Sequence, residues 1–241
     1  MHKVFPLTYL NSVSFSVSFP ELDPDCYVDL VEFLYDNFGI EVPTDRVAIL
    51  KKRPVYFNNR QHSVSWALTA DSIEVNLNQS FYICYQESLL PLVRIIVSFL
   101  DKMGRRFNSL VMNKVNIIPV ELKSYDELGE NVVSTFSDRL LSNWNDEYFF
   151  KDDTTLLYLI KHNYEDVDIE TVSGFISKDG VPENQPARYI LDLTATCEKG
   201  VSDGKCSERD DLETIALCMN DMLYSVFTES VTEDILKSME G

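Results

Sequence analysis

Hydrophobic and polar residues alternate strictly near the start of the chain. Serines at positions 12, 14, 16 and 18 alternate with four apolar residues, which are Val13, Phe15, Val17 and Phe19. This period of two predicts a strand with one buried face and one polar face. Asp23 and Pro24 then have the order typical of a helix start, and apolar residues at helical spacing predict an amphipathic helix that ends near Gly39.

Short runs of β-forming residues follow that helix in the first half of the chain. We expect strands over residues 47–57, 64–68, 73–77 and 110–122. A turn at Ala70 and Asp71 joins two of these strands, and such short connections favour antiparallel pairing. The long apolar segment 82–103 predicts the main core helix.

The second half repeats a similar rhythm of strands and helices. The pattern predicts a polar helix over 124–141, strands over 155–162, 169–177 and 189–196, and an amphipathic helix over 210–226. Ser230 and Glu233 have the spacing of a capping box for a short final helix. The sequence therefore predicts a single α+β domain, residues 1–241, with a mostly antiparallel sheet and packed helices. A division into two similar lobes, 1–122 and 123–241, stays open.

The composition favours a folded protein of the cytoplasm. The 241 residues are 45% hydrophobic, which is enough to bury a sizeable core. Five cysteines without a C-x-x-C spacing fit a reducing compartment, and Cys197 and Cys206 are best interpreted as unrelated thiols. The first residues lack the apolar run of a signal peptide. The most apolar stretch, Leu89–Leu100, is shorter than the roughly 20 residues of a membrane span, so we expect no membrane association.

The charge of the chain is strongly negative and unevenly distributed. The formal net charge is −18, and residues 1–120 hold 11 Lys+Arg and 12 Asp+Glu, whereas residues 121–241 hold 10 and 27. This acidity argues against duplex nucleic acid as a partner. One acidic cluster is predicted to lie in a turn between strands, where a protein with a basic face could reach it: Glu165, Asp166, Asp168 and Glu170. The alternative is a surface that only keeps the protein soluble.

A basic cluster in the first half is the second candidate for partner binding. Lys51, Lys52 and Arg53 lie close to Tyr56 in a predicted edge segment. Basic and aromatic side chains on a sheet edge can bind single-stranded nucleic acid. Charged residues also protect edge strands from aggregation, and we favour that interpretation here.

The sequence contains none of the common catalytic or cofactor motifs. It has no zinc-ligand spacing, calcium loop, phosphate-binding glycine loop or serine-hydrolase elbow. We therefore expect no metal, no cofactor and no catalytic residue. One fragment keeps an alternative open, because Glu121-Leu122-Lys123 at a strand end resembles half of a metal-dependent nuclease site.

Four segments together resemble a sporadically distributed family of uncharacterised bacterial and archaeal proteins of about this length, often encoded near mobile or defence genes. The segments are VSFSVSFP, WALTADSIEVNLNQSFY (Trp66–Tyr82), LVMNKVNIIPVE, and the ending YILDLTA followed by MNDMLYSVFTESVTEDI. In the third segment the family usually begins its strand with arginine and tyrosine, so no role of that arginine transfers to this chain. The resemblance implies a single α+β domain and a partner within a defence-type gene neighbourhood.

These observations favour a protein that binds another protein rather than an enzyme. The leading hypothesis is a non-catalytic, antitoxin-like, immunity-like or adaptor component of a prokaryotic defence or mobile-element system, whose partner has a basic face. The alternative hypothesis is a metal-dependent enzyme that processes nucleic acid.

Overall fold

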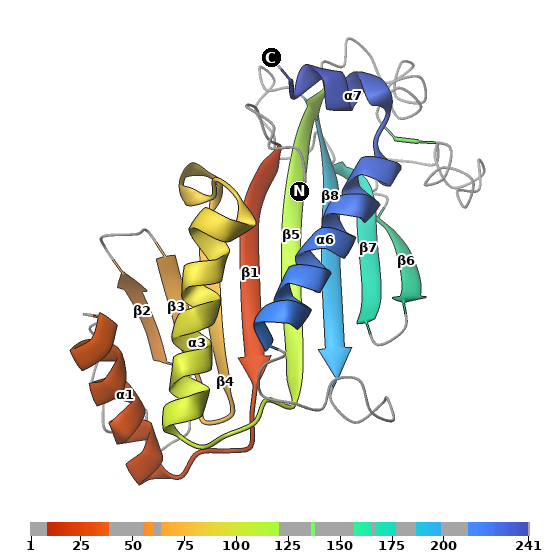
Figure 1. The fold of residues 1–241 in the computed structure, drawn as a ribbon. Helices are drawn as coiled ribbons and strands as arrows, with labels where there is room; N and C mark the ends of the chain where they lie inside the picture. Colours follow the sequence, from red (N-terminus) through yellow and green to blue (C-terminus); the bar gives the residue numbers. More distant parts are fainter. Residues whose placement is uncertain are drawn as a thin grey trace.

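The computed structural model describes residues 9–38, 55–59, 64–120, 136–137, 157–164, 167–176, 187–198 and 212–240. Strands and helices both contribute to it, so the predicted α+β class is confirmed (Figure 1). The strands are β1 (Leu10–Ser18), β2 (Val55–Asn59), β3 (Val64–Leu68), β4 (Ser72–Asn78), β5 (Ser109–Val120), β6 (Leu157–Tyr164), β7 (Val167–Ile176) and β8 (Ala187–Glu198). The α-helices are α1 (Pro24–Phe38), α3 (Leu90–Lys102), α6 (Leu212–Ser230) and α7 (Glu233–Ser238).

The named strands form one antiparallel sheet in the order β2-β3-β4-β1-β5-β8-β7-β6. This order is symmetric about the contact between β1 and β5. One half runs from β1 to α3 and the other from β5 to α6, and each places its first strand at the centre of the sheet and its second strand at an edge. Each half ends in a helix, and α3 and α6 lie on the same face of the sheet (Figure 1). The topology therefore repeats from β5 onward, while the division into lobes 1–122 and 123–241 stays a prediction.

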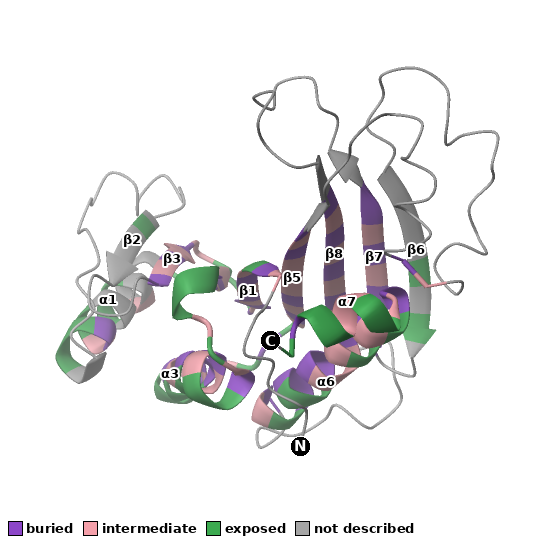
Figure 2. Ribbon diagram, turned by 90° about the horizontal axis from the view of Figure 1, so that it is seen from above, coloured by how far each residue is buried: buried purple, intermediate pink, exposed green. Residues whose placement is uncertain are grey.

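The two faces of the sheet differ in what covers them. The helices α3 and α6 lie along one face of the sheet (Figure 2). The apolar residues of the alternating strands are buried together with those of α3 and α6 in one core. One cross-strand row on this side contains residues that are at most 1% exposed: Trp66, Val75, Phe15, Met112 and Ala195. Burial of such apolar surface is the main contribution that stabilises the fold.

The predicted strand and helix at the beginning of the chain are confirmed. Asp23 caps α1, because its Oδ1 accepts a hydrogen bond from the backbone N–H of Cys26 at 2.8 Å. Pro24 occupies the first helical position, where its missing N–H costs no hydrogen bond. The predicted end near Gly39 lies outside the described residues.

The turn between β3 and β4 fixes the path from β1 into α1. It falls at Ala70 and Asp71, as predicted, and its carbonyl groups accept hydrogen bonds from Leu22 N at 2.7 Å and Phe19 N at 2.8 Å. The Thr69 hydroxyl donates to Asp71 Oδ1 at 2.7 Å, which holds the turn itself. These hydrogen bonds attach the segment after β1 to the turn between β3 and β4.

The core helix predicted over 82–103 starts later and in two parts. Tyr85–Leu89 form a π-helical turn, and regular α3 follows with Pro91 in its first turn. Proline has no N–H to donate, so a regular α-helix cannot run through this position from further upstream. The rings of Phe19 and Phe99 meet edge to face at 5.5 Å and attach α3 to the end of β1.

The strands and the long helix predicted in the second half are confirmed as β6, β7, β8 and α6. Most of the predicted helix over 124–141 lies outside the described residues. At Phe136 the prediction is wrong, because this residue is in a β-bridge and not in a helix. Phe136 forms a β-bridge with Val231, and its ring packs edge to face against Tyr189 at 5.5 Å. This contact joins the segment after β5 to the end of α6 and to β8.

The predicted capping box is wrong. Thr232, rather than Ser230, is the N-cap of α7. Ser230 is the last residue of α6, and its hydroxyl donates to the Val226 carbonyl of that helix at 2.6 Å. Because α7 begins at Glu233, the cap position belongs to the residue directly before it, and Ser230 lies two residues too early.

None of the helices in the described part of the chain is long and apolar enough to cross a membrane.

Candidate functional site

No described helix crosses the sheet face opposite α3 and α6 (Figure 2). The strand registers place polar residues on this face. The serines of β1 lie on this side, as their alternation predicted. The register continues the polar row outward from Ser14 to Asn76 on one side and to Asn113 and Thr194 on the other. We call this surface the open face. Its partly or fully exposed residues include Ser14, Ser16, Glu74, Asn76, Asn113, Asp168, Glu170, Asp192 and Thr194.

Two of the predicted acidic residues belong to the open face. Asp168 and Glu170 are residues of β7 and do not lie in the turn, so their predicted position between the strands is wrong. They lie opposite Asn163 and Lys161 of β6, where Asn163 Nδ2 donates to Asp168 Oδ1 at 2.6 Å and Lys161 Nζ lies 2.9 Å from Glu170 Oε2. A carboxylate is tolerated in a strand when it has a polar cross-strand partner and access to solvent, as both of these have. Glu165 and Asp166 lie outside the described residues.

The open face is acidic across several strands. Its described side chains include five acids: Glu74, Asp168, Glu170, Asp192 and Glu198. Among the described side chains of this face, Lys161 is the one basic residue, and it already pairs with Glu170. The surface therefore carries a negative charge that extends well beyond the predicted cluster, and it attracts cationic groups.

The carboxylate of Asp192 lies near the middle of the sheet, within a polar cluster. Asn113 Nδ2 donates to Asp192 Oδ1, and it also contacts Thr194 Oγ1 at 2.9 Å. Partial burial raises the pKa of Asp192 above its ordinary value, the hydrogen bond from Asn113 opposes this shift, and the charge of Glu170 adds to it. In the sequence these residues are only polar positions of two alternating strands. Their contact could not be predicted, because a long connection separates the two strands.

One charged side chain, Lys114, lies on the opposite side of the sheet, towards the helices. Its Nζ donates to Asn220 Oδ1 of α6 at 2.6 Å and lies 5.8 Å from the centre of the Tyr82 ring. Although part of the side chain is accessible, burial of the ammonium lowers its pKa to about 8, an effect that the charge of Asp221 opposes. The sequence signal for this contact is a lysine at a core-facing position of the apolar strand LVMNKVNII. The contact holds α6 against β5.

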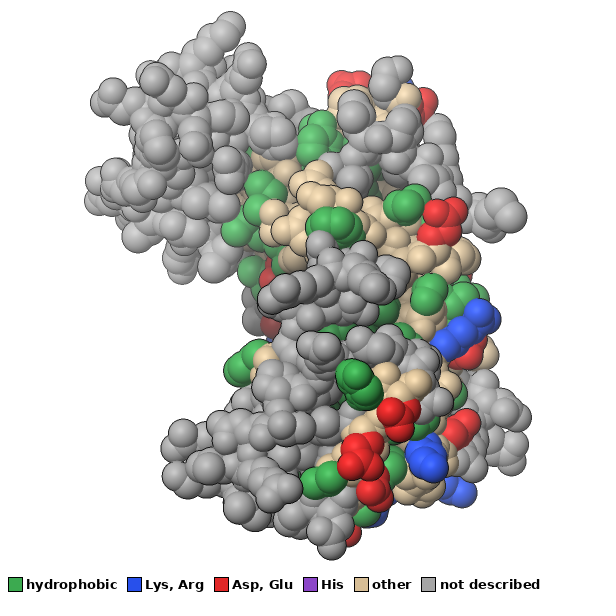
Figure 3. All heavy atoms as spheres, turned by 90° about the vertical axis from the view of Figure 1, so that its left-hand side faces the viewer, with side chains coloured by type: hydrophobic (Ala, Val, Ile, Leu, Met, Phe, Trp, Pro, Cys, Tyr) green, Lys and Arg blue, Asp and Glu red, His purple; other side chains and the backbone are tan. Residues whose placement is uncertain are grey.

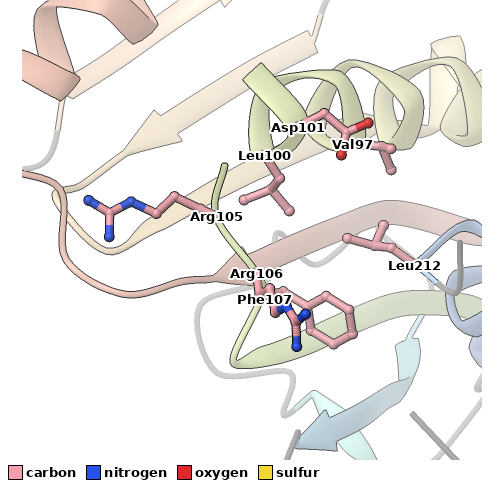
Figure 4. A pocket seen from close by; sticks show the side chains of 7 residues that line it. All are labelled: Val97, Leu100, Asp101, Arg105, Arg106, Phe107 and Leu212. Carbon is pink, nitrogen blue, oxygen red and sulfur yellow. The ribbon is translucent and has the colours of Figure 1, made fainter. Parts of the chain in front are cut away.

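A small hollow lies where α3 ends and α6 begins (Figure 4). Its volume is about 20 Å³, which is of the order of the space needed by a single water molecule. Arg105 and Arg106 contribute to its wall, but their guanidinium groups point in different directions (Figure 4). The hollow therefore has neither the size nor the converging basic groups of an anion-binding site.

The basic cluster of Lys51, Lys52 and Arg53 lies outside the described residues. The neighbouring strand β2 is at the edge of the sheet, as predicted, and its Tyr56 is 72% exposed. An edge position is consistent with both earlier interpretations of the cluster, partner binding and protection of the strand.

Acidic surface is also present in the first half of the chain. Three residues of α1 are exposed acids, namely Asp29, Glu32 and Asp36. Acidic side chains gather on the side of the molecule that carries α1 and β2 (Figure 3). These acids lie away from the open face, so they offer a natural comparison for its charge.

No described residues form a metal site. Across the described ranges, no three His, Cys, Asp or Glu side chains are arranged to hold a metal ion. Glu121 and Lys123, the residues of the nuclease alternative, lie outside the described residues. Cys197 is buried in β8, and Cys206 again lies outside.

Comparisons with known proteins identify no family for this chain. No protein-family model matches the sequence, and no curated protein matches it. One solved structure with some likeness is Methanococcus jannaschii TBP, at 12% sequence identity and a TM-score of 0.30, covering 92% of this chain and 100% of that chain. A likeness at this level carries no argument about structure or function.

Proposed function

We propose that this chain is a non-catalytic binding protein whose open face docks on a basic surface of another protein. The observation that carries the proposal is a sheet face that no described helix crosses, with acids on β4, β7 and β8 and a lysine that is already paired. Such a face offers small hydroxyl side chains at its centre and complementary charge for lysine and arginine. An antitoxin-like, immunity-like or adaptor role in a prokaryotic defence or mobile-element system is part of the same proposal.

The charge of the open face favours a basic protein over nucleic acid. Nucleic acid needs a surface that replaces its counterions, which an acidic face cannot supply. A partner with lysine and arginine would meet Asp168 and Glu74 at the two sides of the serine-lined centre. Attraction of this kind mainly accelerates association, and it weakens as salt is added because the screening length is about 8 Å at physiological ionic strength.

The test is a pull-down from the native host with three forms of the protein as bait. The wild type is compared with Glu74→Lys/Asp168→Lys, which reverses two open-face acids. The matched control is Asp29→Lys/Glu32→Lys, which makes the same change in net charge on α1. We expect one partner to be retained by the wild type and the α1 control and lost from the open-face variant. Equal retention by all three forms would contradict the proposed surface.

The enzyme alternative has its own direct test. Purified protein is incubated with labelled DNA and RNA in the presence of Mg²⁺ or Mn²⁺. The proposal predicts no cleavage above that of a buffer control. Cleavage that Glu121→Ala abolishes would replace the binding proposal with the metal-dependent enzyme.

A further inference from the structure

Asp192 differs from other carboxylates of the open face in its surroundings. It lies in β8, opposite Val115 of β5 on one side and opposite Val172 of β7 on the other. Ile190 lies two residues away in the same strand, so it is on the same face. All four residues are partly exposed. The three apolar residues, which we call the apolar patch, therefore flank a carboxylate at the surface.

Two acids of the neighbouring strand β7 have polar cross-strand partners instead. Asp168 is exposed and lies opposite Asn163 and Thr196. Glu170 lies opposite Lys161 and pairs with it. Water and polar side chains balance these two charges, whereas the neighbours of Asp192 in the adjacent strands are valines.

The charge of Asp192 is not balanced by a cation among the described side chains. Its hydrogen-bond partner is the neutral amide of Asn113, which donates to Oδ1, and no described group donates to Oδ2. The ion pairs of the described residues do not include Asp192. Burial raises its pKa, because a charge in these surroundings has lost part of its hydration. A cation that reached Oδ2 would restore much of the lost stabilisation.

We propose that Asp192 is the anchor of the open face and receives one lysine or arginine side chain of the partner. The cationic group pairs with Oδ2 of Asp192, and the methylene groups of its stem pack on the apolar patch. Lysine and arginine both carry their charge on an aliphatic stem, which matches a carboxylate with apolar flanks. Pairing of charges that are both withdrawn from water contributes more than pairing at an exposed rim. The proposal rests on the proposed function, because it names the contact that a basic partner makes on the open face.

A small cation tests the anchor without the partner. The probe is n-butylguanidinium, a guanidinium group on an aliphatic stem, and the control is methylguanidinium, with the same charge and a shorter stem. The full-length protein with ¹³C-labelled aspartate carboxyl groups is titrated with each cation at pH 7. The signal that is missing from the spectrum of Asp192→Asn identifies Asp192.

We expect the Asp192 signal to reach half-saturation at a concentration of n-butylguanidinium at least about fivefold lower than that of methylguanidinium, because the longer stem buries more methylene groups. The Asp168 signal should respond equally to both cations. An Asp192 signal that does not shift, or one that responds equally to both cations, would overturn the proposal.

The partner captured by the wild type tests the same contact in the complex. Asp192→Asn removes the charge and keeps an oxygen that accepts from Asn113, and it should weaken partner binding at least about tenfold, mainly through faster dissociation. Asp168→Asn is the matched comparison, because it removes one charge at an exposed position of the same face, and it should weaken binding by less than about threefold. Urea denaturation should show that Asp192→Asn is at least as stable as the wild type, so unfolding would not explain its loss of binding.

The outcomes separate this proposal from the proposed function. If the partner is lost from Glu74→Lys/Asp168→Lys but tolerates Asp192→Asn as well as Asp168→Asn, the open face is the docking surface and the anchor is wrong. If no partner depends on the open face, the proposed function fails. The titration with n-butylguanidinium then still decides whether Asp192 and the apolar patch bind an aliphatic cation.

Discussion

The two faces of this sheet use the same strands for opposite purposes. In β1, Phe15 is fully buried under the helices, whereas its neighbour Ser14 lies on the open face between Asn76 and Asn113. The helix side depends on close packing, and the open face depends on charge and hydrogen bonds that water can also supply. Stability and binding should therefore respond to different substitutions, even at adjacent positions of one strand.

The largest effect is expected from adjacent substitutions in β1. Phe15→Ala removes a fully buried ring at the centre of the sheet and should lower the free energy of unfolding by about 3–5 kcal/mol. Ser14→Ala should change it by less than about 0.5 kcal/mol, because the side chain is on the open face. Urea denaturation measures both. Similar losses for the two variants would mean that the open face is packed like the core.

An intermediate effect is expected from Lys114, the charge on the helix side. Its pKa of about 8 lies below the ordinary value of 10.5, so between these values the folded protein has lost a proton that the unfolded chain still binds. Lys114 should therefore make the free energy of unfolding rise by about 1–2 kcal/mol between pH 8 and 9.5, relative to a variant without this lysine.

Two lysine variants separate this effect from others. Lys114→Met should abolish the rise in stability above pH 8. Lys161→Met, at an exposed lysine of the open face, should retain it. If Lys114→Met keeps the full rise, another group is responsible and the buried ammonium does not limit stability.

The smallest effect is expected from Asp192 on the open face. Burial raises its pKa in the folded protein, so the folded protein binds a proton before the unfolded chain does as the pH falls. This group thus favours folding at low pH and opposes it once ionised. Asp192→Asn keeps an acceptor for Asn113, so it should stabilise the protein slightly at pH 7, and the gain should shrink on acidification. Denaturation of both forms at pH 7 and pH 4 checks this, and a gain that grows with acid would contradict it.

Local patterns predicted most of the individual elements. The alternation in β1, the cap at Asp23 and the turn at Ala70 and Asp71 depend on neighbouring residues, and each is confirmed. The capping box failed because two adjacent signals compete there. Ser230 bonds back into α6, and Thr232 takes the cap position.

Contacts between distant segments could not be predicted in the same way. Asn113 and Asp192 are 79 residues apart, and they meet only because β5 pairs with β8. The sequence indicated the acidity of the open face through Asp168 and Glu170, but not that acids of β4 and β8 would join them. Such a surface depends on strand order, which no local period encodes.

The most direct measurement of the central claim is the rate at which the captured partner associates with each charge-reversed form. At low salt, Glu74→Lys/Asp168→Lys should slow association by about tenfold or more, and added salt should reduce the difference. Asp29→Lys/Glu32→Lys, with the same net charge, should associate at nearly the wild-type rate. Equal slowing by both variants would show that only the overall charge matters, and unchanged rates in both would show that the open face is not the docking surface.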